Sequence, residues 1–461
     1  MSGDNMPLTG DRRQYLKAIG VGVVAGFAGC AGGDGGDGGD GGDGDDGGDG
    51  GGDGGTPSGD GGDGDTPTAT ATGTPGPSVD EVIIGANHPL TGFLGRAGQA
   101  MSKAGQLAVK HINDGGVVPG FDDGGIPSLG GAQLSFINGD NEATQELGPQ
   151  VEQNLIDEGA AVITGCYSSP VTLGAMQVAE REQVPHIIDV SVANRILQDR
   201  GAQFTYRIQT PASGMAGNYA EFMPTIARDN GKTMDTASLV YLDNAFGQSM
   251  RDTLRTDLPE NGVELVQETA YSFGQENMNT PATRVKQADA DAFIFVGYGG
   301  GAIRMMNSLQ NVNYRPPLLT GTSTPAFTDG SVVRDIGKFA NHGFGNNYEW
   351  NYSLDWVDRI FADYRVEFGE PLEVVHTVMT YTAVVTAANA IEEAGSADPV
   401  DINEALRDIT VSDHPAASGE ITFQENGENA NALSPMLQVQ NLEPLVVYPT
   451  EYAQAEVSFP E

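Results

Sequence analysis

The chain has 461 residues and carries 23 Lys and Arg against 63 Asp and Glu, which gives a formal net charge of -40 at pH 7. Such a charge excludes nucleic acid as a partner, because its phosphates would be repelled. The length exceeds that of one ordinary domain, so we expect more than one folded unit.

The first 30 residues have the pattern of an export signal. Arg12 and Arg13 precede an apolar stretch over residues 18–28, which is too short to span a membrane comfortably and therefore predicts a processed leader. The segment resembles a twin-arginine signal peptide. Residues 27–30 resemble a lipobox, in which Cys30 is lipidated and becomes the first mature residue. The alternative is a thiol at Cys30 without a role.

Residues 31–78 consist of Gly and Asp in near-triplet repeats, followed by Thr, Pro and Ala. Almost nothing in this tract is able to form a core, so it is predicted to be a disordered, self-repelling tether. Calcium-binding β-roll repeats are an alternative reading of the Gly-Gly-Asp pattern. Those repeats need a periodic aliphatic residue, which this tract lacks.

From residue 80 onward, strand and helix patterns alternate. The first set of strands is expected at 82–85, 132–137, 161–164 and 186–189, with helices at 97–113, 145–158 and 170–182. A second set follows, with strands at 237–242, 264–271, 292–296 and 318–320 and helices at 210–230, 248–258, 281–287 and 302–309. Residues 356–409 are strongly helical, and the tail from 418 has short strands. The alternation predicts two α/β lobes, each a doubly wound, mostly parallel sheet covered on both faces.

The unit from residue 160 to 191 is the strongest candidate for a binding site. Ser168, Ser169 and Pro170 open a helix directly after a buried strand, with Ser169 predicted as N-cap and Pro170 at N1. Open α/β sheets bind ligands at this carboxyl edge, and a helix N-terminus favours an anion. A carboxylate is therefore expected on Ser168, Ser169 and Thr172, and the next strand brings Ser191 to the same edge. The alternative is that Ser169 only caps the helix.

The remaining candidate motifs, a Gly run, one cysteine and the histidines, do not predict a catalytic, metal or cofactor site. Residues 297–302 follow a strand as a dinucleotide-binding loop would, but no acidic residue follows about twenty positions later, so the Gly run more plausibly lets Tyr298 approach a ligand. Cys166 is expected to be a packed small residue rather than a functional thiol. No two His residues have the spacing of a local metal motif and no Gly-x-Ser-x-Gly occurs, so neither an enzyme, a metal nor a cofactor is expected.

The order of these features resembles the type I periplasmic-binding-protein fold, specifically the branched-chain amino acid and amide family of ABC-transporter substrate-binding lipoproteins. The resemblance covers about residues 80–445. It is carried by Gly85 with residues 89–92, residues 162–165 with Ser168 and Ser169, residues 185–188, Leu197, Arg200, Gly201, Tyr206, Arg207, Asp243, Phe246, Gly247, residues 291–295, Gly297 and residues 419–423.

The resemblance implies two lobes that close on a ligand like a hinge, joined by three crossovers near Gln209, Asn346 and Ser418. The first lobe would comprise residues 79–208 and 347–417, and the second 209–346 and 418–461. In this family, Ser169 matches the serine that holds the ligand carboxylate, and Ser191 matches the first residue of the following small loop. Further positions implied to line the site are Phe246 and Tyr298 on the second lobe and Thr91 and Phe93 on the first-lobe lip.

Two departures from the family pattern concern the ligand. Ala193 replaces a threonine near Ser191, and the acidic residue that holds an α-ammonium would fall near Ser323, where no acid occurs. Without a buried counter-charge an ammonium is costly to desolvate. A carboxylate or amide without that group is therefore an alternative to an amino acid. An aromatic acid would stack on Tyr167, Phe93, Phe246 and Tyr298.

The expected function is extracytoplasmic capture of a small carboxylate or amide-bearing ligand, branched-chain amino acid-like, for delivery to an ABC permease. The expected form is a monomer on the outer face of the cell membrane, anchored through a lipid. A sensor ectodomain of the same fold, an enzyme and a structural surface protein are the rivals; the chain ends without a membrane or signalling segment, which favours delivery. The dense acidic surface, with Arg at most basic positions, is similar to that of haloarchaeal proteins, in which molar salt screens self-repulsion. An ordinary acidic protein is the alternative.

Overall fold

The structure is a computed structural model that describes residues 79–198 and 201–459. All of these belong to the second of two units, Met1–Pro77 and Ser78–Glu461. The predicted export signal, Cys30 and the predicted tether lie outside the described residues. Within the described part of the chain, no helix combines the length and the apolar character that crossing a membrane requires.

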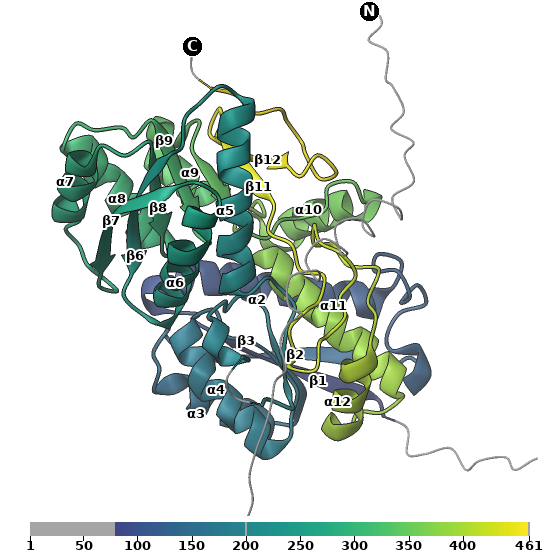
Figure 1. Ribbon diagram of the computed structural model, residues 1–461. Coiled ribbons are helices and arrows are strands. Elements are labelled where there is room, and N and C mark those ends of the chain that lie inside the picture. Colours follow the sequence, from purple (N-terminus) through teal and green to yellow (C-terminus); the bar gives the residue numbers. More distant parts are fainter. Residues whose placement is uncertain (1–78, 199–200, 460–461) are drawn as a thin grey trace, which may run out of the picture. The chain divides into compact units, whose positions relative to one another are not determined.

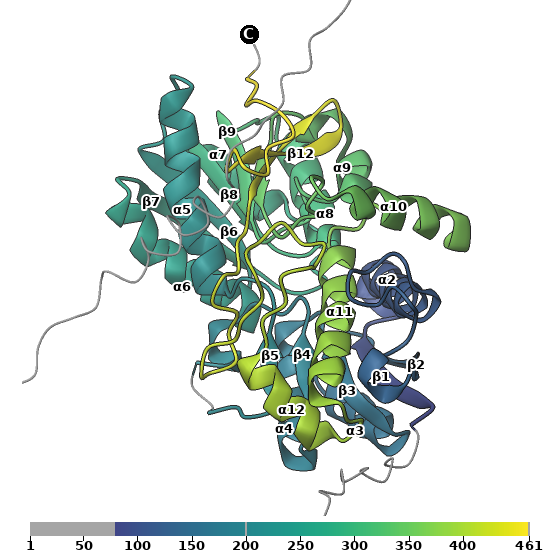
Figure 2. The same ribbon diagram turned by 90° about the vertical axis from the view of Figure 1, so that its right-hand side faces the viewer.

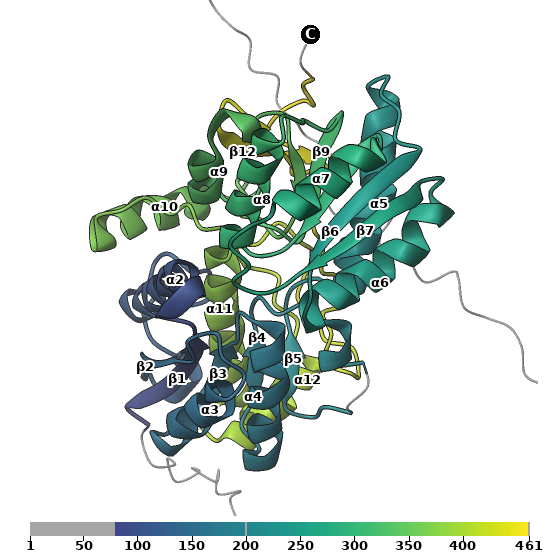
Figure 3. The ribbon, with the colours of Figure 1, turned by 90° about the vertical axis from the view of Figure 1, so that its left-hand side faces the viewer.

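The first lobe is built on a five-stranded parallel sheet with the order β2-β1-β3-β4-β5. Figure 1 labels β1, β2 and β3, and Figure 3 also labels β4 and β5. The strands β3 and β4 are buried along their whole length, as expected for a parallel sheet with both faces covered. The strand bounds are β1 (Glu81–His88), β2 (Gln133–Asp140), β3 (Ala160–Gly165), β4 (His186–Ile188) and β5 (Thr205–Arg207).

Helices cover both faces of this sheet. One face carries α3 (Leu147–Asp157) and α4 (Ser169–Glu182), which pack against each other and lie in front in Figure 3. The other carries α2 (Gly95–Asp114), α11 (Thr377–Ala394) and α12 (Pro399–Asp408), which are seen in Figure 2. The helix α11 is buried almost all round because its sequence has apolar or small residues on every side. A distant part of the chain thus completes the first lobe.

The second lobe has a seven-stranded sheet with the order β12-β11-β10-β9-β8-β6-β7. Its strands from β10 to β7 are parallel, while β11 runs antiparallel to both of its neighbours. The strand bounds are β6 (Thr236–Leu242), β7 (Glu264–Tyr271), β8 (Ala292–Val296), β9 (Leu318–Thr322), β10 (Phe344–Asn346), β11 (Met436–Gln440) and β12 (Glu443–Tyr448).

The helices of the second lobe form two groups. The pair α5 (Ala212–Asp229) and α6 (Ala245–Glu260) pack together, as do α7 (Asn279–Ala288), α8 (Gly299–Asn311) and α9 (Gly330–Ile336) in succession. The helix α10 (Asp355–Phe368), which lies between β10 and α11 in the chain, packs on α2 of the first lobe. Short 3-10 helices occur at η1 (Gly92–Leu94), η2 (Pro127–Leu129), η3 (Asn194–Ile196) and η4 (Gly337–Ala340). The predicted α/β class with two mostly parallel sheets is confirmed.

The segments that connect the lobes also contact one another. Trp350 pairs with Ala416 in an isolated antiparallel bridge, and Arg207 pairs with Glu428 in a parallel one. The backbone N–H of Ala417 donates to the carbonyl of Glu349 at 2.7 Å. The connecting segments are therefore joined to one another by backbone hydrogen bonds, in addition to being continuous with the two sheets.

A buried charged pair ties α3 to β4. His186 Nδ1 lies 2.6 Å from Glu152 Oε1, and His186 Nε2 lies 2.8 Å from the carbonyl oxygen of Gly165. Asn87 donates to the other oxygen of Glu152 at 2.7 Å. Both ring nitrogens thus face oxygen atoms, which is the arrangement of an imidazolium beside a carboxylate. Burial alone would lower the pKa of His186, but the Glu152 charge and these hydrogen bonds raise it above its ordinary value.

The raised pKa predicts a loss of stability at alkaline pH. A His whose pKa is higher folded than unfolded stabilises the fold fully below about pH 6.5, and this contribution is lost as pH rises through the folded pKa. We expect the melting temperature at constant molar salt to fall by a few degrees from pH 6.5 to 9. In Glu152→Gln, which starts from a lower melting temperature, this fall should disappear. The same slope in the variant would contradict the assignment.

Candidate functional site

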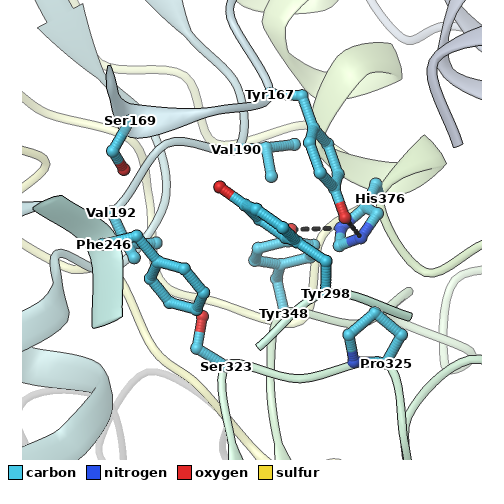
Figure 4. A pocket seen from close by; sticks show the side chains of 10 residues that line it. All are labelled: Tyr167, Ser169, Val190, Val192, Phe246, Tyr298, Ser323, Pro325, Tyr348 and His376. Atoms are coloured by element: carbon cyan, nitrogen blue, oxygen red, sulfur yellow. Dashed lines mark hydrogen bonds between the residues drawn. The ribbon is translucent and has the colours of Figure 1, made fainter. Parts of the chain in front are cut away.

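The carboxyl ends of strands from both sheets meet at one cavity (Figure 4). Each lining residue comes directly after a strand or at the beginning of a helix. Tyr167 and Ser169 follow β3, Val190 and Val192 follow β4, Phe246 lies at the start of α6 after β6, Tyr298 follows β8, Ser323 and Pro325 follow β9, Tyr348 follows β10, and His376 precedes α11. The edge that the sequence identified for the first lobe therefore faces its counterpart in the second.

The cavity is almost filled by aromatic side chains. The ring of Tyr298 stacks on Phe246 and lies beside Tyr167, with 5.4 Å between ring centroids in each case. The centre of a water molecule can move in about 20 Å³ of the remaining space, which is room for about one water. The Tyr298 hydroxyl from the second lobe donates to Ser168 Oγ of the first at 3.3 Å. A ligand larger than water therefore requires Tyr298 to withdraw, as lobe opening would allow.

The start of α4 differs from its prediction by one residue. The N-cap is Ser168, without a side-chain capping bond, and Ser169 is already the first helical residue with Pro170 at N2. The N–H groups of Val171 and Thr172 both donate to the Ser168 carbonyl. Since Pro170 has no N–H, the amides of Ser168 and Ser169 are those at this helix start that make no hydrogen bond within the described residues. The N–H groups of Val171 and Thr172 are therefore not free for an anion at this helix N-terminus.

The Ser169 side chain lines the cavity and keeps a free proton. Its Oγ accepts a hydrogen bond of 3.2 Å from the N–H of Ala193. A hydroxyl is one donor as well as an acceptor, so the Ser169 O–H remains available to a ligand. The predicted role of Ala193 thus becomes one of orientation: its backbone holds the Ser169 hydroxyl, and its methyl group does not line the cavity.

Thr172 and Ser191 were predicted to contact ligand, but their hydroxyls lie against each other. Thr172 Oγ1 is 2.5 Å from Ser191 Oγ, which donates to the carbonyl of Cys166 at 2.5 Å. Neither side chain lines the cavity. The two residues join the end of β3 to the loop after β4, behind Ser169. Cys166 is fully buried, and burial raises the pKa of its thiol, which agrees with a packed residue.

Thr91 and Phe93 also lie outside the cavity. The Thr91 hydroxyl donates to Asp140 at 2.6 Å. The ring of Phe93 stands edge to face with Phe273 of the second lobe at 4.9 Å. A Cβ at Gly300 would lie 2.6 Å from this ring, so that glycine is where the Gly run accommodates Phe93. The predicted lip of the first lobe thus contacts the second lobe at the rim.

A buried arginine fixes the loop that carries Val192 and Ala193. Arg207 Nη1 and Nη2 donate to the carbonyls of Val192 and Ala193, each at 2.9 Å. Its Nε lies 3.6 Å from the buried carboxylate of Glu428. Burial raises the pKa of Glu428 and the arginine charge opposes this. Arg207 therefore positions the loop whose amide orients Ser169.

His376 and Tyr348 are lining residues that the sequence analysis missed. His376 Nε2 is 2.8 Å from the Tyr167 hydroxyl, and its Nδ1 is hydrogen-bonded to the Tyr348 hydroxyl. Burial lowers the pKa of His376 to about 3, so the ring is neutral at physiological pH. No local motif marks either residue, because the two lie far apart on the stretch between β10 and α11 and meet Tyr167 only in the folded protein.

The side chains that line the cavity include no acidic group in the part of the chain that the structure describes. The buried carboxylates nearby are engaged elsewhere. Asp189 accepts from His88 and Thr380, each at 2.8 Å. Asp329 accepts from the backbone N–H groups of Ser331, Val332 and Val375. The position expected to be acidic for an α-ammonium is occupied by Ser323, which does line the cavity.

A family model described as periplasmic binding protein matches residues 81–442. The chain belongs to this family. It is a solute-binding protein rather than an enzyme, and its two lobes have the type I fold. Among curated proteins it is similar to Leu/Ile/Val-binding protein homolog 7 of Brucella suis, at 23% identity over 395 residues that cover 84% of this chain and 96% of the relative.

Two solved structures illustrate the fold. The chain is similar to the branched-chain amino acid transporter substrate binding protein of Streptococcus pneumoniae in complex with isoleucine, with a TM-score of 0.66 and 18% identity over 79% of this chain and 97% of that one. It is also similar to an ABC-transporter solute binding protein from R. palustris in complex with benzoate. There the TM-score is 0.67 and the identity 17%, over 82% of this chain and 98% of that one.

The role of Arg207 predicts a large stability effect. Arg207→Met should lower the free energy of unfolding by about 3–5 kcal/mol, because it leaves the Glu428 carboxylate buried without a counter-charge. The double variant Arg207→Met/Glu428→Gln should lose less than the single one, since the buried charge is gone. Urea unfolding at constant salt measures both. A double variant less stable than Arg207→Met would contradict the charge-pairing account.

Proposed function

We propose that this protein captures a small carboxylic acid without a charged amino group, aromatic or branched aliphatic, and delivers it to an ABC permease. The observation that carries the proposal is the composition of the cavity. Ser169 offers a hydroxyl proton beside a free helix N-terminal amide, the remaining wall is mainly aromatic, and none of the described residues that line it is acidic.

The relatives support both a branched aliphatic and an aromatic side group on the ligand. Their names point to leucine, isoleucine and valine, and one solved neighbour holds isoleucine. Another holds benzoate, which has a carboxylate but no ammonium group. An amino acid would need a counter-charge for its ammonium group inside the closed site, where desolvation is costly. The residues of this cavity therefore favour the second kind of ligand over an amino acid.

The contacts of Tyr298 hold the two lobes together in the described conformation. In the described conformation its ring occupies the cavity, and its hydroxyl joins the lobes through Ser168. A planar acid inserted between Tyr167 and Phe246 would take the place that the Tyr298 ring now fills. Ligand binding is then coupled to the movement of Tyr298 out of this place, which lobe opening allows.

The test is the affinity of Ser169→Ala for carboxylic acids. Native protein should bind at least one member of a panel that includes benzoate, 4-methylpentanoate and leucine. Loss of the hydroxyl removes one hydrogen bond to a buried anion, worth about 1.5–3 kcal/mol, so the affinity should fall about ten- to a hundredfold. Titration calorimetry on folded protein measures this.

Ser102→Ala is the matched control, because the Ser102 hydroxyl bonds Asn138 at 2.7 Å away from the cavity. Its affinity should remain that of native protein. Equal affinity in Ser169→Ala would remove the carboxylate from this site. Tight binding of leucine without binding of the deaminated acids would overturn the preference proposed for the ligand.

We further propose that the protein is exported by the twin-arginine route, lipidated at Cys30 and held outside the cell in high salt. The support is the order of Arg12, Arg13, the apolar stretch and Cys30 in the sequence, together with its charge of -40. Cys30→Ser should move the protein from the membrane fraction to the medium. Replacing Arg12 and Arg13 by Lys should instead retain it in the cell. Unchanged membrane association of Cys30→Ser would refute the anchor.

A further inference from the structure

Three side chains at one end of the cavity form a hydrogen-bonded unit, Tyr167–His376–Tyr348. The two tyrosines line the cavity and occupy the two ring nitrogens of the histidine between them. Figure 4 shows this unit across the cavity from Ser169, with Tyr298 lying between. It therefore faces the part of a ligand that lies away from a carboxylate bound at Ser169.

The proton count of this unit leaves one donor unused. A neutral imidazole has one N–H and one acceptor nitrogen, so it donates to one tyrosine oxygen and accepts from the other hydroxyl. The hydroxyl that accepts keeps its own proton, and neither hydroxyl makes another hydrogen bond within the described residues. Because either tautomer of His376 satisfies this count, the free proton can belong to Tyr167 or to Tyr348. The unit as a whole always presents one O–H donor, together with oxygen lone pairs.

Charged groups do not complete the unit. Asp189 and Asp329 are the acids close enough to affect these side chains. Asp329 accepts the hydrogen bonds described above, whereas Asp189 accepts through Oδ2 and its Oδ1 has no hydrogen-bond partner within the described residues. Neither lines the cavity. The lowered pKa of His376 agrees with a neutral ring. A neutral donor and acceptor pair matches a hydroxyl or carbonyl group of a ligand, and a buried polar group of this kind is costly to leave unpaired.

We propose that the Tyr167–His376–Tyr348 unit binds a hydroxyl or carbonyl oxygen that the ligand carries away from its carboxylate, so that the captured acid is an oxygen-substituted one. The inference rests on the proposed function, since it assumes a carboxylate at Ser169. His376 is a positioning residue, because it acts through the two tyrosine hydroxyls. Ser169 selects the acid, and the unit selects the substituent at the other end.

The experiment compares acids that differ by one oxygen. The probes are benzoate with 3-hydroxybenzoate and 4-hydroxybenzoate, and pentanoate with 5-hydroxypentanoate, titrated calorimetrically in molar salt. Native protein should bind the better hydroxylated member of at least one set about tenfold or more tightly than its parent acid, as one additional hydrogen bond allows. In Tyr167→Phe/Tyr348→Phe this ratio should fall to about one.

Tyr219→Phe is the matched control. The Tyr219 hydroxyl is also fully buried and bonds one side chain, Thr320, at 2.5 Å, but it lies outside the cavity. Tyr219→Phe should keep the native affinity ratio. If the loss of any buried tyrosine hydroxyl changed the ratio merely by disturbing the fold, Tyr219→Phe would change it as well. Equal binding of parent and hydroxylated acids by native protein would contradict the inference without any variant, whereas the double variant decides whether a native preference comes from the two tyrosines.

The outcomes separate the two proposals. Parent and hydroxylated acids that bind native protein equally well would overturn this inference and leave the proposed function intact. A native ratio that persists in the double variant would also overturn it, because the selecting group would lie elsewhere. If no carboxylic acid binds, the proposed function fails and this inference fails with it.

Discussion

The parallel direction of the strands is the constraint on which the site depends. In both sheets the carboxyl ends of β3, β4, β8 and β9 point to one cavity, and each is followed by a residue that lines it. A right-handed β-α-β chain leaves its strands at the same edge every time, so polar groups distant in sequence collect there without any local motif. The bridging bond from Tyr298 to Ser168 is possible only because two such edges face each other.

The site uses neutral groups although the chain is strongly charged. A protein with a net charge of -40 repels a carboxylate at a distance, and this repulsion reaches about 10 Å at 0.1 M salt but only about 3 Å at 1 M. The hydrogen bonds at Ser169 act over shorter distances and inside a closed cavity, where salt has little access. High salt would therefore remove the barrier to the approach of an anion while leaving its recognition intact. The proposed environment and the proposed ligand are mutually consistent on this ground.

The sequence indicated lining residues of both lobes, but not the two that lie between β10 and α11. Ser169 was predicted because it follows a strand in a regular α/β alternation, which fixes its position at the edge. Phe246 was implied by the family resemblance, and Tyr298 by the resemblance and by the Gly run beside it. Thr172 and Ser191 lie at the same edge, yet their hydroxyls bond to each other, and sequence alone does not show which way a hydroxyl points. The N-cap error arose because Pro fits the first turn at more than one position. Tyr348 and His376 carry no pattern, since only the tertiary fold brings these segments to Tyr167.

The connections between the lobes suggest which contacts of the cavity persist when the lobes separate and which ones break. Tyr348 and His376 lie near the two ends of the segment that leaves β10 and enters α11, and its neighbour Trp350 pairs with Ala416 of another connection. Segments close to a hinge move least when lobes separate. The Tyr167–His376–Tyr348 unit is therefore expected to remain assembled in an open protein, whereas the bond from Tyr298 to Ser168 must break. A ligand would then meet groups that are already in position as soon as Tyr298 withdraws, so that the fixed half of the cavity can hold the acid while the lobes are open.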